Sequence, residues 1–199
     1  MMKNLSYLCI NNGIKSRKMN KKIIWNTAGT AGLALGAVST VCMFAGQYLS
    51  TLKLSAGATT FTGTILWIVE TVTCIWLMRF FMSKMVKENP EANNSDTFKM
   101  GMATALLSGL IYSAMTFANI AFISADYYTE NVYTLIQQMS STLDSNSMDA
   151  VEKLLDYLPQ ISFFTNLAQC FIFGTIVAGI LSRSIPKKDP FADYKPDEQ

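Results

Sequence analysis

Four long stretches nearly free of ionised side chains constrain this chain more than any other feature of its sequence. Three of them cover residues 23–52, 100–125 and 157–182, and the fourth, 54–78, contains the single charge of Glu70. A helix that crosses about 30 Å of hydrocarbon needs roughly 20 predominantly apolar residues. Each stretch exceeds that length, so the pattern predicts four transmembrane helices.

The predicted fold is all-α, an integral membrane four-helix bundle whose membrane domain covers residues 23–184. The spans are placed at about 24–49, 60–83, 98–124 and 158–182. A large soluble helical bundle is the alternative, but its helices would carry polar stripes of Lys and Glu at helical spacing. The four stretches lack such stripes. Only 15% of the residues are charged, against about 25% in a soluble domain.

Both ends of the chain differ from this membrane domain. Residues 1–22 are basic and contain only a short apolar patch, without the small-residue cleavage site of a signal peptide. We expect them to form a disordered extension, with Met19 as an alternative start. Residues 185–199 are rich in proline and mixed charge. We expect them to be a disordered cytoplasmic tail.

The positive charges predict the orientation. With the N-terminus inside, fourteen of the sixteen Lys and Arg residues lie on the inner side, and only Lys53 and Lys153 lie outside. Loops rich in Lys and Arg stay on the cytoplasmic side. Both termini are therefore expected in the cytoplasm.

The outer segment between the third and fourth spans, about 128–157, has two notable features. It belongs to an acidic region that carries six Asp and Glu residues against Lys153. Its apolar residues recur at helical spacing on both sides of the break at 144–147, which predicts a helical hairpin. The apolar stripe of that hairpin requires a contact, and its own bundle, the membrane surface and a protein partner all stay open. Pro159 then marks the start of the fourth helix.

Glu70 is the one acid inside a span. It lies about ten residues from the outer start of the second span, or roughly 15 Å deep at 1.5 Å per residue. A carboxylate at that depth is costly unless it is neutral, paired or facing water. Two interpretations stay open: a neutral Glu that pins the bundle by hydrogen bonds, and a site for a proton or cation. Tyr112 and Gln169 reach the same depth, and we expect Glu70 to bond to one of them.

A polar stripe accompanies Glu70. The third span has small and polar residues at helical spacing, namely Gly101, Ala105, Ser108, Tyr112, Thr116 and Asn119. The fourth span adds Ser162, Asn166 and Gln169 on one face, and the first span adds Gln47. Such residues either line a solute path or bridge neighbouring helices in lipid. The candidate polar site comprises Glu70, Tyr112, Asn119, Asn166 and Gln169.

Glycines mark the expected places of close helix packing. Gly32 and Gly36 form a GxxxG pattern, and Gly174 with Ala178 repeats the spacing of small residues. Without side chains, two backbones can approach closely. The candidate packing residues are Gly32, Gly36, Gly109 and Gly174, and packing within the monomer is favoured over packing between copies.

Several functions lack support in the sequence. The chain has no His, the commonest general base and nitrogen ligand. Its four Cys residues form no CxxC pair and are expected to be small apolar side chains, without disulfide or metal. No catalytic group or phosphate loop is recognisable. A non-enzymatic protein is therefore predicted, with no cofactor, no metal and no nucleic acid partner.

The chain resembles the Bacteroidota membrane proteins catalogued as domain of unknown function 4199, over about residues 21–188. The resemblance is carried by the Gly-rich first span, the basic loop after the second span, the segment 148–152 leading to Pro159, and the closing segment 174–181 followed by Lys187 and Lys188. It implies a four-helix, multi-pass protein of the bacterial inner membrane and supplies no activity.

Two functions remain as hypotheses. The first is a non-enzymatic scaffold or accessory subunit, whose acidic outer segment binds a membrane or periplasmic protein. The second is a small proton-coupled carrier or channel, oligomeric, that uses Glu70.

Overall fold

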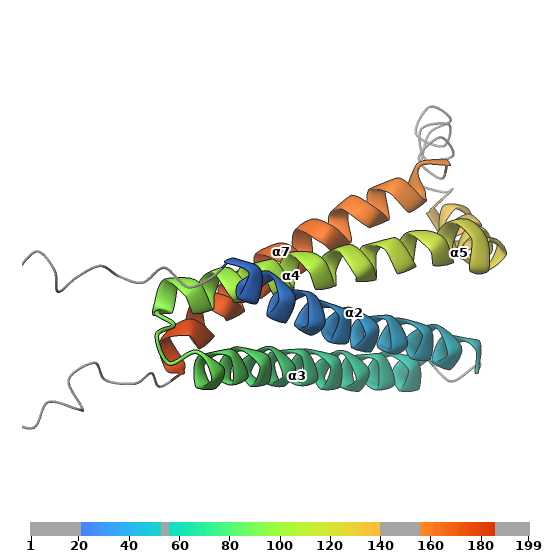
Figure 1. The fold of residues 1–199 in the computed structure, drawn as a ribbon. Helices are drawn as coiled ribbons and strands as arrows, with labels where there is room; N and C mark the ends of the chain where they lie inside the picture. The colour runs from blue at the N-terminus through green and yellow to red at the C-terminus, as the bar shows by residue number, and fades with distance from the viewer. Residues whose placement is uncertain (1–20, 53–55, 140–155, 186–199) are drawn as a thin grey trace, which may run out of the picture.

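The computed structural model describes residues 21–52, 56–139 and 156–185, and the secondary structure within them is helical throughout (Figure 1). In chain order the elements are α2 (Lys21–Thr51), α3 (Ala56–Glu88), α4 (Asn94–Ala118), the π-helical turn η1 (Asn119–Ile123), α5 (Ala125–Met139) and α7 (Leu158–Ser184). The prediction of an all-helical fold is confirmed at this level. Residues 1–20, 140–155 and 186–199, which hold most of the predicted disordered ends and the second half of the predicted hairpin, lie outside the described ranges.

Four helices are long and apolar enough to cross a membrane: α2, α3, α4 continued by η1, and α7. Their surfaces carry large apolar side chains, and Phe61 is 69% exposed. Exposed apolar area costs about 25 cal/mol per Å² in water, whereas lipid tails accept it. The protein is therefore a multi-pass membrane protein.

Local sequence signals fix where two of these helices begin. The Asn93 side chain accepts a hydrogen bond from the Asp96 backbone N–H at 2.9 Å, and the Asp96 carboxylate accepts one from the Asn93 N–H at 3.5 Å. This reciprocal capping pairs backbone donors that the first turn leaves free. Pro159 lies in the first turn of α7, where its missing N–H costs no helical hydrogen bond.

The four helices are not packed equally. α4 lies in the middle and packs most extensively on α7 and α2, while α3 packs mainly on α2. α3 and α7 come close at the end of the bundle where α4 begins, and they diverge toward the end that carries α5 (Figure 1). We call the first the basic end, because its described residues include Lys22, Lys87 and Arg183, and the second the α5 end.

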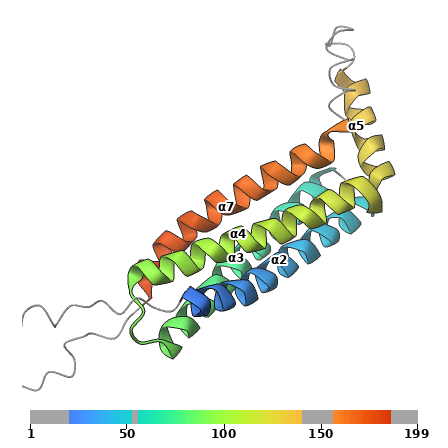
Figure 2. The ribbon, with the colours of Figure 1, turned by 45° about the horizontal axis from the view of Figure 1, so that its top comes forward.

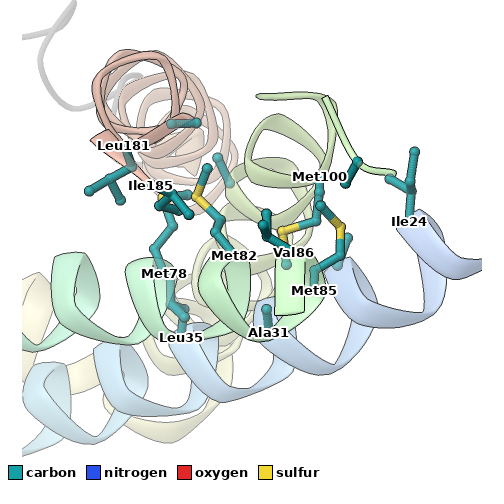
Figure 3. Close-up of a cluster of buried hydrophobic side chains, with 14 residues drawn as sticks. Ile24, Ala31, Leu35, Met78, Met82, Met85, Val86, Met100, Leu181 and Ile185 are labelled. Carbon is teal, nitrogen blue, oxygen red and sulfur yellow. The ribbon is translucent and has the colours of Figure 1, made fainter. Parts of the chain in front are cut away.

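The buried core gathers toward the basic end. Met78, Met82 and Met85 follow one another along α3 at helical spacing and contact a cluster that includes Met100 of α4 and Ala178 of α7 (Figure 3). The flexible, unbranched Met side chain fills irregular gaps between helices. This core joins α3 to its neighbours at the basic end, and it leaves the bundle open farther along.

At the α5 end, the chain leaves the bundle through η1. Ser124 breaks the helix, and α5 then runs in a new direction (Figure 2). Among the described helices, α5 packs on η1 and on no other. Packing on its own bundle, one of the three alternatives for the outer segment, is limited within the described residues to this junction.

Candidate functional site

A cavity of about 390 Å³ lies in the part of the bundle that the core leaves open, and all four spans line it. Its polar side chains come from every span: Ser39 on α2, Glu70 and Thr71 on α3, Ser108 and Tyr112 on α4, and Asn166 and Gln169 on α7. The rest of the lining is mostly apolar. A concave, largely apolar site of 300–1,000 Å³ with a few convergent polar groups is typical of small-molecule binding.

Glu70 supplies the one carboxyl group among the described lining residues, and no Lys or Arg lies among them. Its side chain is half-buried. Ser39 of α2 is a polar neighbour of this side chain, and the Ser39 hydroxyl lies 3.7 Å from the Cys74 sulfur. The carboxyl group therefore faces a cavity without a basic side chain to neutralise it.

Three predicted companions of Glu70 line the same cavity: Tyr112, Asn166 and Gln169. Tyr112 interacts electrostatically with Glu70. The hydrogen bond expected from Glu70 to Tyr112 or Gln169 is not among those of the described side chains, and Ser39 is the polar neighbour that α2 provides. Counting residues along straight helices gave the depth of these groups, but the direction of each side chain depends on packing.

Asn119 lies elsewhere. It belongs to η1, fully buried, seven residues beyond Tyr112. Its amide donates hydrogen bonds to the Gln47 side chain of α2 at 2.9 Å and to the Tyr128 hydroxyl of α5 at 3.1 Å. These bonds join three elements at the α5 end. Asn119 is thus a structural bridge and lines no part of the cavity.

The predicted packing glycines face neighbouring spans within the chain. A Cβ atom added at Gly32 or Gly36 would lie 2.7 Å or 2.9 Å from Leu107 or Ile111 side-chain atoms of α4. One added at Gly174 would lie 2.5 Å from the Ala105 Cβ. A Cβ atom added at Gly109 would lie 3.0 Å from the Cys170 Cβ. The four glycines hold α2 and α7 closely against α4, which is the central helix.

The predicted site residues do not include several that line the cavity, notably Ser39, Trp67, Cys74 and Cys170. A signal for Ser39 was present, because it follows Gly32 and Gly36 on one face of α2 at helical spacing. Cys42, Cys74 and Cys170, expected to be small buried apolar side chains, are free thiols and partly buried. No cluster of three or more His, Cys, Asp and Glu residues in the described part of the chain could hold a metal ion.

Comparison of the chain with family models, with curated proteins and with solved structures gave no match. The geometry of the cavity therefore carries the functional argument.

Proposed function

We propose that this protein is a small carrier or channel of the bacterial inner membrane, in which Glu70 exchanges a proton for a solute inside the central cavity. The observation that supports this proposal is the position of Glu70 in a cavity lined by all four spans, without a Lys or Arg among the described lining residues. The role is non-enzymatic. Both termini are proposed to be cytoplasmic, which puts the basic end inside.

The electrostatics of the cavity support an exchange. An intramembrane carboxylate without a partner is costly, so the group binds either a proton or another cation. Ser39 and the polar groups of Tyr112, Asn166 and Gln169 can solvate only part of a charge. A proton that leaves is thus best replaced by positive charge from a ligand.

The packing of the bundle supports a route for movement. α3 and α7 meet mainly in the methionine-rich core at the basic end, and the cavity lies beyond that core. Thioether side chains repack with little strain because they are flexible. Opening of the cavity toward the cytoplasm would require the contacts of Met78 and Met82 to rearrange. The cavity-lining side chains of the central helix α4 would stay in place.

The test is proton uptake into proteoliposomes that contain a pH-sensitive dye and carry an imposed potassium-diffusion potential. We expect wild-type protein to take up protons faster than Glu70→Gln, which keeps the size and hydrogen bonding of the side chain but cannot ionise. Glu70→Asp retains an ionisable group and should retain part of the flux.

Folding is checked by circular dichroism and gel filtration of the same samples. Equal uptake by wild type and Glu70→Gln, or no uptake above empty liposomes by either, contradicts the proposal.

A second function is supported by a different observation. α5 leaves the bundle, and its described residues meet the membrane domain only at η1. The half-buried Val132 and Ile136 and the exposed Tyr133 leave apolar surface on a helix that also bears Asp126 and Glu130. This surface supports a scaffold that binds a membrane or periplasmic protein through the acidic outer segment.

Cross-linking from α5 in intact cells tests the scaffold. A photo-reactive residue at the exposed Asp126 should yield a discrete protein adduct, and deletion of 130–155, which leaves that residue in place, should remove it. An adduct that also forms at the same yield from a position on the lipid-facing side of α3, such as Val72, would show random collision instead.

A further inference from the structure

The charge of the cavity lining restricts what can bind there. Glu70 is the single carboxyl group, and basic side chains are missing from the described lining. An anionic ligand would meet an uncompensated carboxylate, and a neutral ligand would leave that carboxylate unpaired. A cation removes this cost, because opposite charges attract strongly where water is scarce.

Aromatic side chains line the same cavity as the carboxyl group. Trp67 precedes Glu70 by one helical turn on α3, Tyr112 comes from α4, and Phe173 comes from α7. The face of an aromatic ring carries partial negative charge and attracts cations, with Trp the strongest of the three types. Together, a carboxylate and three rings from three helices provide groups that can attract one positive charge.

The remaining lining selects the kind of cation. Leu35, Ile75 and Val177 are apolar, and Glu70 is the one carboxyl group of the described lining, whereas sites for small inorganic cations are usually built from several charged or carbonyl oxygens. A cation whose charge is shielded by apolar groups gives up little hydration when it enters. Such an ion also fits a cavity of about 390 Å³.

The most exposed parts of the lining indicate how a ligand enters. Trp67 is 64% exposed and Phe173 is 49% exposed, and they belong to α3 and α7, which diverge in this region. The opening between these helices faces the surroundings of the bundle, which for a transmembrane span is lipid. A ligand that enters there must dissolve in the bilayer.

We infer that the cavity binds a lipophilic organic cation, an ammonium or phosphonium centre with apolar substituents, between Glu70 and the rings of Trp67, Tyr112 and Phe173. This inference rests on the proposed function, because it takes Glu70 as the group that gives up a proton, and it adds the chemical class of the ligand. Binding converts the Glu70 carboxylic acid to a carboxylate paired with the ligand, and the proton goes to the solvent.

Other titratable groups near Glu70 do not supply this proton. They are the Cys42 thiol on α2, Cys74 on α3, the Tyr112 phenol on α4 and the Cys170 thiol on α7. Thiols and phenols ordinarily titrate above neutral pH, at about 8.5 and 10. A carboxylic acid is the group of this set that a cation can deprotonate near neutrality.

A pair of ions with the same shape tests the inference without any mutation. Tetraphenylphosphonium and tetraphenylborate differ chiefly in the sign of their charge. Calorimetric titration of the purified full chain in detergent should show saturable binding of the phosphonium, absent or at least about tenfold weaker for the borate. Titrations in two buffers of different ionisation enthalpy should show proton release on phosphonium binding.

Variants assign the binding to the cavity. Glu70→Gln should abolish proton release and weaken phosphonium binding. Trp67→Leu should weaken binding by about fivefold through loss of the ring–cation attraction. Trp76→Leu is the matched control, since Trp76 lies on the same helix, is 62% exposed and does not line the cavity. It should leave binding unchanged.

Each outcome separates the inference from the proposed function. Equal binding of both ions, or equal losses in Trp67→Leu and Trp76→Leu, overturns the inference. Glu70-dependent proton uptake without phosphonium binding also overturns it and leaves the carrier standing. Phosphonium binding with proton release, but without flux in proteoliposomes, supports the binding site and removes the carrier.

Discussion

Gly29 and Gly32 lie less than one helical turn apart on α2 and meet opposite surroundings. A Cβ atom at Gly29 would have no neighbour within 4 Å. At Gly32 it would lie 2.7 Å from the Leu107 Cβ and 3.3 Å from the Ser108 backbone nitrogen. Backbone atoms of α4 cannot rotate away as a flexible side chain can, so the whole helix would have to move.

Opposite effects of one substitution are therefore expected at these two glycines. Gly29→Ala should raise stability by about 0.5–1 kcal/mol, because Ala loses less entropy in a helix than Gly does. Gly32→Ala should lower stability by about 1–3 kcal/mol through overpacking. Thermal unfolding midpoints in one detergent measure both. A rise in both midpoints would mean that α2 and α4 are not packed through Gly32.

At the level of single residues, the sequence predicted much of the cavity. Glu70, Tyr112 and Gln169 were placed at one depth by counting residues, and they line one cavity. Ser39 was missed as the neighbour of Glu70, because depth says nothing about the rotation of a helix around its axis. That rotation depends on which small residues meet, such as Gly174 against Ala105.

Among the elements, η1 is the one that regular helix geometry could not predict. Counting at 1.5 Å per residue assumes that α4 continues unchanged to residue 124, whereas it changes to a π-helical turn at Asn119. π-helical turns are rare and often occur at functional positions. Here the turn places Asn119 between Gln47 and Tyr128. It thereby connects the direction of α5 to the packing of α2.

Removal of the Tyr128 hydroxyl should loosen this connection. In Tyr128→Phe the ring remains, but one N–H of the fully buried Asn119 amide loses its acceptor. An unpaired buried donor costs about 1–3 kcal/mol. Amide hydrogen exchange should become faster in α5 and change little in α2, α3 and α7.

Tyr133→Phe is the control for this prediction, because Tyr133 lies on the same helix and is exposed. Equal exchange rates for the two variants would contradict the bridge. Alkaline pH offers an independent check. Burial raises the pKa of Tyr128 above its ordinary value of 10.0, although the Asn119 hydrogen bond opposes the rise and Tyr127 adds to it. The protonated Tyr128 phenol therefore contributes to the free energy of unfolding below pH 10, and this contribution is lost as the pH rises through the folded-state pKa. The stability of Tyr128→Phe should not show that loss.

For the whole molecule, the unequal packing of the helices links fold to site. Small residues draw α2, α4 and α7 together, and the methionine core adds α3 at the basic end. The four apolar stretches of the sequence predicted the number of spans from charge spacing alone. They did not predict that α3 and α7 diverge. The divergence of α3 and α7 depends on a few contacts in the core cluster, which includes Met82 and Ala178, and is not encoded in the apolar character of either helix.

The charges at the two ends of the molecule predict its orientation in the membrane. The basic end carries Lys and Arg residues at the start of α2, around the α3–α4 connection and at the end of α7. Asp126, Glu130 and Asp156 lie at the α5 end. Transfer of one elementary charge against 100 mV costs about 2.3 kcal/mol. An orientation that puts the basic end outside would accumulate this cost for each translocated Lys or Arg. We therefore expect the basic end to be cytoplasmic.

Single-cysteine variants that keep every Lys and Arg can test this orientation. In a background without the native Cys residues, Ser95→Cys and Ser184→Cys mark the basic end, and Thr129→Cys marks α5, all at exposed positions. A membrane-impermeant maleimide added to intact cells with a permeable outer membrane should label only Thr129→Cys, and lysis should expose the other two. Labelling of Ser95→Cys and Ser184→Cys from opposite sides would rule out a four-span bundle, whereas labelling of both from outside would invert it. In an inverted bundle the cavity would lie on the cytoplasmic side of the methionine core, so proton uptake through Glu70 would begin from the opposite compartment.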